Sequence, residues 1–309
     1  MELLPLVLHV LNVIVIWAVL SLSLNFLQGT AGLFNLGHAA FFCVGAYASA
    51  LLAKAGLPWI VCLLASVLFP ALLALVYGLP TLRLKADYFA TVTMGIGEII
   101  RAVANNLQGV TGGPNGVPSI PCPSLFGFQF SRGPGTLVLG CVVLLLTYLA
   151  LDRWRRSGFG RVLIAAREDP TAAQAMGKDT YHFRLNCFLL SAGFAGIAGS
   201  LFAYYYGYIS PGDFGLWVAY NLTLTLTIGG SGNYRGTMLA AAVFIIMRDG
   251  LRFLPLPPTA QGPLQQLLFG LLMIVIMWRF PQGLIPEVPT ITFAKHSSQR
   301  SEESWESQA

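Results

Sequence analysis

The sequence predicts an all-α integral membrane protein, a polytopic bundle of about nine transmembrane helices. Of its 309 residues, 55% are hydrophobic and only 10% are charged, and the mean hydropathy is +0.68. The apolar residues gather in runs of about 20, the length a helix needs to cross the hydrocarbon layer with its backbone groups paired internally. Soluble proteins do not require apolar runs of this length.

These runs define the predicted spans in chain order. They cover residues 5–28, 31–53, 58–82, 87–108, 136–152, 185–207, 214–230, 236–254 and 263–280. The first run lacks a preceding positive region and a following small-residue cleavage site, and it is longer than the apolar core of a secretory signal, so we interpret it as a span. We expect residues 1–285 to form one transmembrane domain.

The distribution of positive residues predicts the orientation. The formal net charge is +5 and the pI is about 9.0. In a membrane protein, lysine and arginine concentrate in cytoplasmic connections, so this charge indicates a lipid bilayer as partner and no nucleic acid. Seven of the 18 such residues lie in one connection, residues 153–184. If that connection is cytoplasmic, alternation of the spans puts the N-terminus outside and the C-terminus inside.

Two long connections and a polar tail complete the organisation. The connection 109–135 is rich in glycine and proline, which argues against a regular helix there, and by the charge rule it faces outward. Residues 286–309 are polar and of mixed charge, and we expect a disordered cytoplasmic tail.

The connection 153–184 contains a predicted short helix from about Pro170 to Met176. Asp169 before a proline is a good helix start, because the carboxylate accepts hydrogen bonds from first-turn N–H groups and proline at the first position loses none. Gly177 is a good stop. A short helix with a small apolar face between charged flanks suits a groove on another protein. The alternative is a solvated basic loop that only sets the topology.

Ionisable side chains within spans are costly and are therefore functional candidates. Glu98 and Arg101 lie three residues apart on one helix face and can pair there. Beyond them we assign further polar or glycine residues to the same outer part of a translocation path: Asn105, Asn106, Gly112, Gly113 and Asn115. The alternative role of Glu98 and Arg101 is a structural ion pair that holds helices together.

Near the predicted inner ends of the first two spans, Asn35 and His38 are second-rank candidates for the path, together with Asn25. A single histidine in such a setting is more often a hydrogen-bonded packing residue.

Two further patterns concern packing and chemistry. Ala192, Gly196 and Ser200 recur at four-residue intervals, a stripe that lets helix backbones approach closely within one subunit or across a dimer. The five cysteines form no C-x-x-C pair and do not cluster with the four histidines at ligand spacing, so we predict no metal site. No acid–base or nucleophile constellation indicates a membrane enzyme.

Several longer segments carry a resemblance to a known family. They are "GTAGLFNLGHAAFFCVGAYASALL" (29–52), "LRLKADYFATVTMGIGEIIRAVANN" (82–106), "TGGPNGV" (111–117), "GRVLIAAREDP" (160–170), "LLSAGFAGIAGSLFAYYYGYISPGDF" (189–214) and "FPQGL" (280–284). In this order they resemble the M-type permease of the branched-chain (hydrophobic) amino acid ABC importers, over nearly the whole chain. The segment "GGSGNYRG" (229–236) departs from the usual G-G-x-G-[ST]-x-x-G at Asn233, and Asn35 stands where serine is common.

The resemblance extends to the short helix. Thr171, Ala172, Ala173 and Gly177 look like the E-A-A-x-x-x-G coupling loop of ABC importer permeases, with threonine in place of glutamate. In that family this helix docks into the ATPase subunit. The resemblance thus assigns coupling to the segment that contains Arg167, Glu168, Asp169, Thr171, Ala172, Ala173, Met176 and Gly177.

The resemblance also implies the fold type and the partners. It implies a permease of the vitamin-B12-importer type, paired with a homologous H-type permease in a bacterial inner membrane. Two ATPase subunits, which bind ATP and magnesium, and a periplasmic amino-acid-binding protein complete such an importer. Consistently, the sequence has no G-x-x-x-x-G-K-[ST] phosphate loop, so we expect no cofactor in this chain.

Two alternatives remain open. Urea and short amides are carried by close relatives of this family, so the cargo need not be an amino acid. A stand-alone secondary transporter or channel is a different class. It predicts a protonatable relay or broken helices in inverted repeats, and the sequence shows two mid-span acids worth considering and no clear internal repeat.

Overall fold

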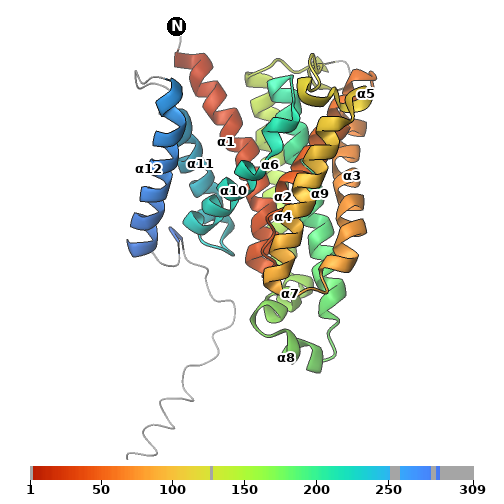
Figure 1. The fold of residues 1–309 in the computed structure, drawn as a ribbon, viewed down its shortest axis with the longest axis vertical. Helices are drawn as coiled ribbons and strands as arrows, with labels where there is room; N and C mark the ends of the chain where they lie inside the picture. The colour runs from red at the N-terminus through yellow and green to blue at the C-terminus, as the bar shows by residue number, and fades with distance from the viewer. Residues whose placement is uncertain (1–2, 126–127, 251–257, 280–282, 286–309) are drawn as a thin grey trace, which may run out of the picture.

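The computed structural model describes residues 3–125, 128–250, 258–279 and 283–285. These residues form a bundle of long helices joined by short helical turns (Figure 1). The predicted cytoplasmic tail, 286–309, lies outside the described residues. The helices are α1 Leu3–Asn25, η1 Phe26–Thr30, α2 His38–Lys54, α3 Trp59–Thr81, α4 Ala86–Asn106, α5 Gln108–Thr111, η2 Gly113–Asn115, α6 Pro134–Arg156, α7 Gly158–Glu168, α8 Pro170–Ala175, α9 Thr180–Tyr206, η3 Pro211–Phe214, α10 Leu216–Gly229, α11 Tyr234–Gly250 and α12 Pro258–Arg279.

The predicted all-helical architecture is confirmed, since a helix overlaps every predicted span within the described residues. By length and composition, four helical runs are long and apolar enough to cross a membrane: Leu4–Thr30, Trp59–Thr81, Pro134–Arg156 and Thr180–Tyr206. The other helices are shorter or more polar. The number of membrane crossings therefore stays a prediction.

The outward faces of the long helices are apolar, as a lipid environment requires. On α3, Leu64 and Val76 are 64% and 72% exposed, and on α6, Leu146 is 61% exposed. In water such faces would promote aggregation, whereas contact with the hydrocarbon of a bilayer carries no free-energy penalty.

Helix α9 is the centre of the bundle, and it packs along α2 and α3. A Cβ atom added at Gly196 would meet the backbone of Ser66 on α3, and one at Gly199 would meet the backbone of Phe42 on α2. Ala192 and Ser200 of the same stripe are also fully buried. The small-residue stripe therefore serves packing within this chain, the first of its two predicted uses.

An aromatic cluster fixes the lower part of this core. Phe41 and Tyr77 stack at 5.6 Å, and both meet the Phe188 ring edge-on at 5.4 Å. Phe89 of α4 contacts Phe188 at 5.9 Å, so the cluster joins α2, α3, α4 and α9. Aromatic pairs in these geometries add about 0.5–1.5 kcal/mol each beyond their buried area.

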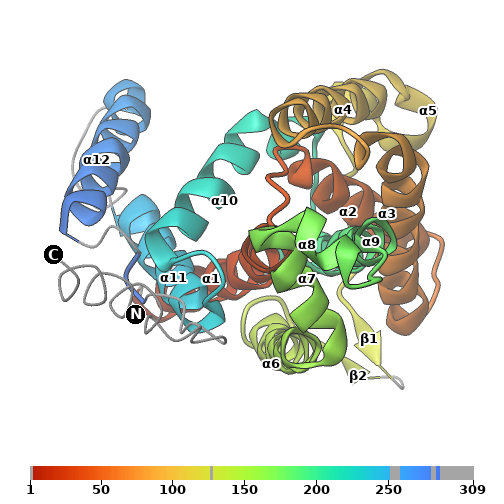
Figure 2. The ribbon, with the colours of Figure 1, turned by 90° about the horizontal axis from the view of Figure 1, so that it is seen from below.

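The remaining helices surround this core. Figure 2 shows α12 at one edge of the molecule, beside α10 and α11, with α3 and α4 at the opposite edge. The short helices α7 and α8 cap the end of the bundle opposite the N-terminus (Figure 1). We call this the α8 end.

The connection 109–135 contains short regular elements that the sequence did not predict. Residues 109–135 are not free of helix, because they contain most of α5, the short 3-10 turn η2 and a two-stranded hairpin of β1 Ser124–Leu125 and β2 Phe128–Gln129. Glycine explains how: Gly112 adopts φ +74°, which ends α5 after one turn. The connection is tied to the end of α9 by a bridge between Val117 and Ile209.

Candidate functional site

The predicted short helix exists as α8, and Asp169 caps its start. The Asp169 carboxylate accepts hydrogen bonds from the N–H groups of Thr171 at 2.9 Å and Ala172 at 3.0 Å, and from the Thr171 hydroxyl at 2.5 Å. The hydroxyl bond and the two backbone bonds lower the pKa of Asp169, because they stabilise its charged form. The helix start predicted from the sequence is confirmed.

Gly177 ends α8 as predicted. It adopts φ +75°, its N–H donates to Gln174 O at 2.8 Å, and the next N–H, of Lys178, donates to Ala173 O at 3.2 Å. This pair of bonds is the Schellman motif, which pairs the last carbonyls of a helix and favours glycine at the left-handed position. Both ends of α8 are thus fixed locally, although a six-residue helix is too short to be stable by itself.

The faces of α8 divide the predicted coupling residues into two groups. Met176 is 81% exposed, and Ala172 is exposed as well, so both are available to a partner protein. Ala173, in contrast, is 5% exposed and packs inside the chain. A bulky residue at Ala173 would disturb internal packing, which makes Met176 the better probe of docking.

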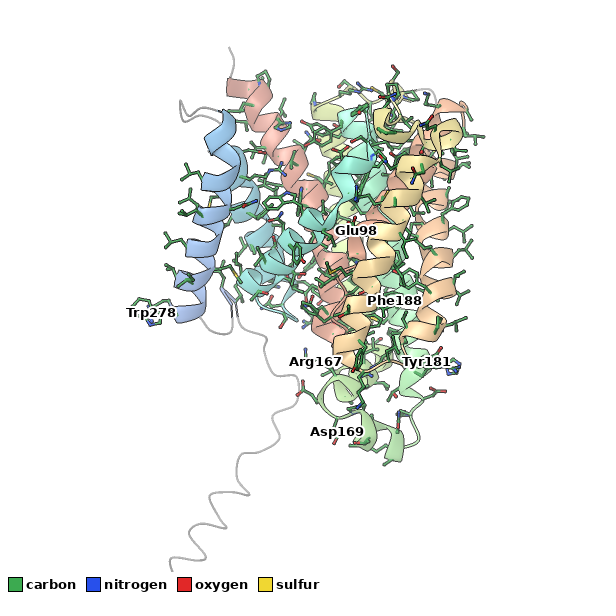
Figure 3. All side chains as sticks on the ribbon, viewed as in Figure 1. Glu98, Arg167, Asp169, Tyr181, Phe188 and Trp278 are labelled. Carbon is green, nitrogen blue, oxygen red and sulfur yellow. The ribbon has the colours of Figure 1, made fainter. Side chains whose placement is uncertain are left out.

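Neighbouring side chains anchor the α8 segment to the bundle. The Tyr181 hydroxyl donates to Leu79 O at the end of α3 at 2.8 Å, and Arg83 lies over the Tyr181 ring. Arg184 donates to Ala166 O at 2.7 Å, which pairs a carbonyl at the end of α7. Figure 3 shows Arg167, Asp169 and Tyr181 together at the α8 end.

Arg167 reaches from this segment into the bundle. Its guanidinium donates one hydrogen bond to the carbonyl of Gly29 in η1 and two to Glu168, at 2.8 and 3.0 Å. The Arg167 side chain is 23% exposed and that of Glu168 is 67% exposed. The sequence assigned Arg167 to the surface that faces a partner, but the structure turns its side chain toward the end of the first helix.

The predicted span 31–53 is wrong in its first turns, because residues 32–37 are not helical and α2 begins only at His38. Gly32 adopts φ +70°, a conformation that interrupts a helix. This stretch leaves η1 and leads into α2 without a regular backbone. We call residues 32–37 the break.

The break returns into the bundle before α2 starts. His38 Nε2 lies 2.7 Å from the hydroxyl of Ser23, two turns before the end of η1. A Cβ atom added at Gly37 would collide with the backbone of Thr93, two turns into α4. At 1.5 Å per residue, α2 therefore starts about 10 Å inward from the α8 end of its neighbours.

Three buried polar atoms around the break have no hydrogen-bond partner within the described residues. They are Gln28 Oε1, Asn35 Nδ2 and His38 Nδ1. Asn35 uses its oxygen to accept the Gly37 N–H at 2.8 Å, and His38 packs edge-on against Phe41. The histidine thus has a structural role on one side of its ring, as its packing interpretation predicts, while its other nitrogen stays available.

A second glycine turn, residues 230–233, contacts α1 and η1 just before the break and was not predicted as part of the site. Asn25 on α1 accepts the Gly232 N–H at 2.8 Å and donates to the Thr237 hydroxyl at 2.5 Å. A Cβ atom at Gly29 would collide with Gly232. The signals were the glycines of "GGSGNYRG" and the buried Asn25, but their pairing across more than 200 residues is not readable from the sequence.

Asn233 also has a local role. Its side-chain oxygen accepts the N–H groups of Arg235 at 3.0 Å and Gly236 at 3.3 Å, in the first turn of α11. Serine, threonine and asparagine all cap helix starts in this way. The departure from the usual [ST] at this position therefore preserves the same capping function.

Glu98 and Arg101 pair on α4 as predicted. Arg101 Nε and Nη2 lie 2.8 and 2.7 Å from Glu98 Oε2. The two side chains are 31% and 37% exposed, about half-way along α4 (Figure 3). Because both partners belong to one helix, the ion pair does not tie two helices of this chain together.

The structure brings the break close to this pair. Gly97, next to Glu98, would place a Cβ atom 3.4 Å from Gly37 Cα. The two groups of residues that the sequence assigned separately to the path, Asn35 with His38 and Glu98 with Arg101, therefore lie at neighbouring positions along α4, with Arg101 itself beside Gly215 at the start of α10.

The other predicted path residues lie at the C-terminal end of α4 and just beyond it. Asn105 is half-buried, and its carbonyl lies 3.0 Å from the position of a Cβ atom on Gly113. The Asn106 side-chain amide donates a hydrogen bond to Ala102 O at 2.9 Å, one turn earlier on the same helix. Asn115 is exposed in η2, and Gly112 ends α5.

Comparisons with known proteins identify the family. Residues 6–277 match the family model described as branched-chain amino acid transport system / permease component. The chain belongs to this family. It is a multi-pass membrane component of a transport system, and the family is not one of enzymes.

Relatives of known description cover most of the chain. The high-affinity branched-chain amino acid transport system permease protein LivM of Escherichia coli (strain K12) is 36% identical over 295 residues, 88% of this chain and 68% of the relative. The probable branched-chain amino acid transport permease protein LivM of Methanocaldococcus jannaschii is 27% identical, covering 91% and 95%. The permease protein LivH of Salmonella typhimurium is 23% identical, covering 74% and 79%. No solved structure matches the chain.

Proposed function

We propose that the chain is the M-type permease subunit of an ABC importer that moves branched-chain or other hydrophobic or neutral amino acids across a bacterial inner membrane. Membership of the branched-chain amino acid permease family supports this proposal, as does the 36% identity to a protein described as high-affinity LivM. Weaker similarity to LivH proteins supports a homologous H-type permease as the partner. The energy would come from two ATPase subunits that hold ATP and magnesium, and a periplasmic binding protein would deliver the cargo.

The observation that carries the proposal is the construction of α8 and its link to the bundle. The capped helix presents Met176 at the end of the molecule opposite the N-terminus. Through Arg167, the same segment holds the carbonyl of Gly29, where η1 passes into the break. A push on α8 would thus move the start of the break. A loop that only set the topology would need no such link.

The break and the Glu98–Arg101 pair support a path for a zwitterionic cargo. Irregular backbone at membrane depth is tolerated where it lines a cavity or is covered by protein. A charged pair that is one-third exposed on a span is costly against lipid, so this face of α4 is expected to meet water or a partner subunit. The passage we propose is weakly polar and binds cargo weakly, because the binding protein supplies the affinity.

The proposed topology has about nine crossings, with the N-terminus outside and the α8 end in the cytoplasm, in a fold of the vitamin-B12-importer type. The overlap of a described helix with each predicted span supports this proposal, although α10 and α11 have only 14 and 17 residues. Short helices of this kind need protein on several sides to satisfy their ends. The partner permease would provide part of this surrounding protein.

The test is uptake by the reconstituted importer. We expect proteoliposomes with all subunits to take up leucine only when ATP is supplied, and Met176→Asp to lower that uptake at least tenfold, because a buried charge at an interface is costly. Leu84→Asp is the control, since Leu84 is an apolar residue at the same end, 43% exposed, but outside α8.

Each other outcome favours a named alternative. Normal uptake by Met176→Asp would remove the docking role of α8. Leucine uptake by the chain without ATPase subunits would favour a stand-alone transporter or channel. ATP-dependent uptake of urea or acetamide without leucine would assign the chain to the importers of short amides.

A further inference from the structure

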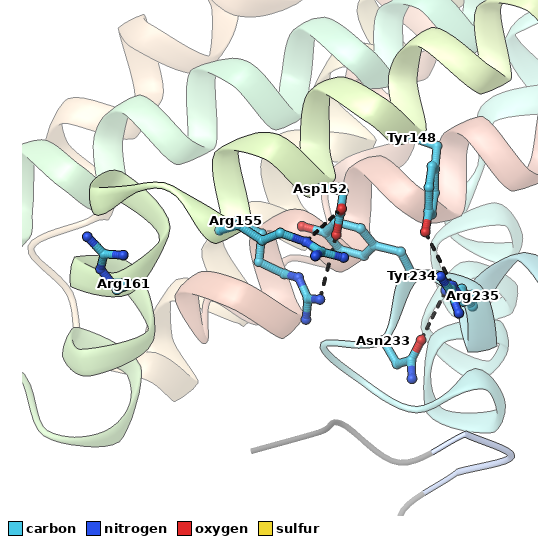
Figure 4. Close-up of a pocket in the computed structure, with 8 residues that line it drawn as sticks. Tyr148, Asp152, Arg155, Arg161, Asn233, Tyr234 and Arg235 are labelled. Carbon is cyan, nitrogen blue, oxygen red and sulfur yellow. Dashed lines mark hydrogen bonds and ion pairs between the residues drawn. The ribbon is translucent and has the colours of Figure 1, made fainter. Parts of the chain in front are cut away.

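A basic cavity opens at the α8 end, and none of residues 32–37 is among its lining residues within the described part of the chain. It has a volume of about 460 Å³ and lies between the end of α6, the start of α7 and the start of α11. Figure 4 shows its lining, with Tyr148, Asp152 and Arg155 on α6, Arg161 on α7, and Tyr234 and Arg235 on α11. Arg156 also lines it. None of these residues belongs to the predicted coupling surface or path.

The cavity carries an excess of positive charge. Asp152, the one carboxylate among its described lining residues, lies 3.7 Å from Arg155 Nη2 and 2.8 Å from Arg156 Nε, so it is shared by two guanidinium groups. Arg235 has a neutral partner, the Tyr148 hydroxyl, at 3.5 Å. Arg161 adds a fourth positive charge. Four arginines against one carboxylate favour an anionic ligand.

Arg155 shows that this charge is only partly compensated. Its Nη1 donates to Gly232 O at 2.9 Å, and its guanidinium lies 5.2 Å from the centre of the Tyr234 ring. Its Nε is buried without a hydrogen-bond partner in the described part of the chain. Guanidinium groups with donors to spare, beside tyrosine hydroxyls, are suited to phosphate oxygens.

An apolar groove continues from the cavity along the outside of α6 and α11, away from the α8 end. This second hollow, of about 530 Å³, shares Tyr148 and Arg235 with the cavity and is otherwise lined by Cys141, Leu144, Leu145, Met238 and Leu239. These residues lie one to two turns further along α6 and α11. Leu145 and Leu239 are 58% and 54% exposed, so the groove opens to the outside of the bundle.

The combination of a basic cavity with an apolar groove determines the class of ligand. A soluble phosphate or nucleotide would use the arginines but leave the groove unused. An acidic loop of a partner protein would bind at the end of the bundle, outside the hydrocarbon layer. A phospholipid matches both parts, because its anionic headgroup suits the basic cavity and its acyl chains suit the apolar groove.

We propose that the cavity and the groove together bind an anionic phospholipid of the leaflet at the α8 end. The anionic headgroup lies in the cavity that Arg155, Arg161 and Arg235 line, and an acyl chain lies between α6 and α11. The assignment of this leaflet to the cytoplasmic side rests on the proposed topology, but lipid binding itself does not rest on the proposed cargo or on the ATPase partners.

The site has a route to the transport region. Arg155 holds the carbonyl of Gly232, while Asn25 on α1 holds the N–H of the same residue. A phosphate that fixes Arg155 would therefore brace the turn 230–233 against α1, next to the break. We expect anionic lipid to raise transport as well as to bind.

Lipid binding is tested on the delipidated full-length chain by native mass spectrometry. The probes are dioleoyl phosphatidylglycerol, dioleoyl phosphatidylcholine, which has the same chains without net charge, and inorganic phosphate. We expect retention of phosphatidylglycerol over phosphatidylcholine. Arg161→Gln and Arg235→Gln should each weaken it about fivefold, the effect of one basic residue near an anionic headgroup. Arg153→Gln is the control, because Arg153 is exposed at the same end but does not line the cavity.

A second variant separates the lipid from a free anion. Leu239→Trp fills the groove and leaves the arginines in place, so it should weaken retention of phosphatidylglycerol. The proposal is overturned if both glutamine variants retain phosphatidylglycerol like the unmodified chain, if Leu239→Trp has no effect, or if inorganic phosphate displaces the lipid at equal concentration. Because no ATPase, binding protein or cargo is present, failure here is distinct from failure of the proposed transport function.

Discussion

The guanidinium of Arg167, next to the capped helix α8, donates a hydrogen bond to the carbonyl of Gly29, where the first helix of the bundle ends. The two residues are 138 positions apart in the sequence. Their contact connects the proposed docking surface with η1, which leads into the break. It gives the first prediction its mechanism.

We expect Arg167→Ala to uncouple ATP hydrolysis from uptake. Its hydrogen bond to Gly29 is charge-assisted, and such bonds contribute about 1.5–3 kcal/mol. Without it, closure of the ATPases would move α8 but not η1, so uptake per ATP should fall about tenfold while ATP hydrolysis continues. Parallel measurement of ATP hydrolysis and leucine uptake in proteoliposomes checks this. Lys178→Ala, which removes an exposed charge from the same connection, is the control. An equal fall of both activities would indicate failed assembly instead.

The second prediction concerns pH and the cap of α8. The Thr171 hydroxyl and two backbone N–H groups lower the pKa of Asp169 below its ordinary value, near 3.9. A carboxylate whose pKa is lower in the folded chain stabilises the fold above the unfolded pKa, and this contribution is lost as the pH falls through the folded pKa. The order of α8 should therefore not change between pH 8 and about pH 5 and should decrease only in more acidic solution.

Substitutions at Asp169 check this prediction. The Asp169→Asn variant would still cap the helix, since asparagine and aspartate are comparable caps, but its amide cannot titrate. Hydrogen exchange of the α8 amides, corrected for intrinsic rates, should show protection in Asp169→Asn that no longer depends on acid, and low protection at every pH in Asp169→Ala. Acid-dependent protection that persists in Asp169→Asn would assign the titration to another group.

The third prediction tests the break by its glycines. Gly37→Ala would drive a Cβ atom into the backbone of Thr93, so we expect α2 and α4 to separate, with a lower midpoint of thermal unfolding in detergent and strongly reduced uptake. Gly95→Ala, on the same α4, meets nothing within 4 Å and is the control. It should raise the stability by about 0.5–1 kcal/mol, the usual preference for alanine over glycine in a helix. Equal behaviour of the two variants would refute the close approach.

The sequence predicted the helices well, because membrane thickness imposes a length that hydropathy reveals directly. It failed at the break for a physical reason. Leu33, Phe34 and Leu36 are apolar, so the segment resembles a span, and hydropathy does not register that Gly32 takes a positive φ. It also missed α7, which lies in the charged connection 153–184 and is held by contacts such as that from Arg184.

Candidate residues were predictable where their interactions lie within one helix or at its ends. The Asp169 cap, the Gly177 stop and the Glu98–Arg101 pair all follow from spacings of three residues or fewer, or from the ends of one helix. The contacts Arg167–Gly29 and Asn25–Gly232 connect distant segments and depend on how helices pack. No pattern within one element indicates them.

The last prediction decides between the two roles of the Glu98–Arg101 pair. An ion pair that is one-third exposed contributes about 0–1 kcal/mol to stability, and this one joins residues of a single helix. We therefore expect Glu98→Gln to leave the midpoint of thermal unfolding nearly unchanged and to lower the rate of leucine uptake, since it leaves the charge of Arg101 uncompensated on the proposed path. The exchange Glu98→Arg with Arg101→Glu restores the pair but reverses its direction along α4. If the pair acts on a passing zwitterion, uptake should stay low in the exchanged protein. Normal uptake with reduced stability in Glu98→Gln, and recovery of stability in the exchange, would assign the pair a structural role.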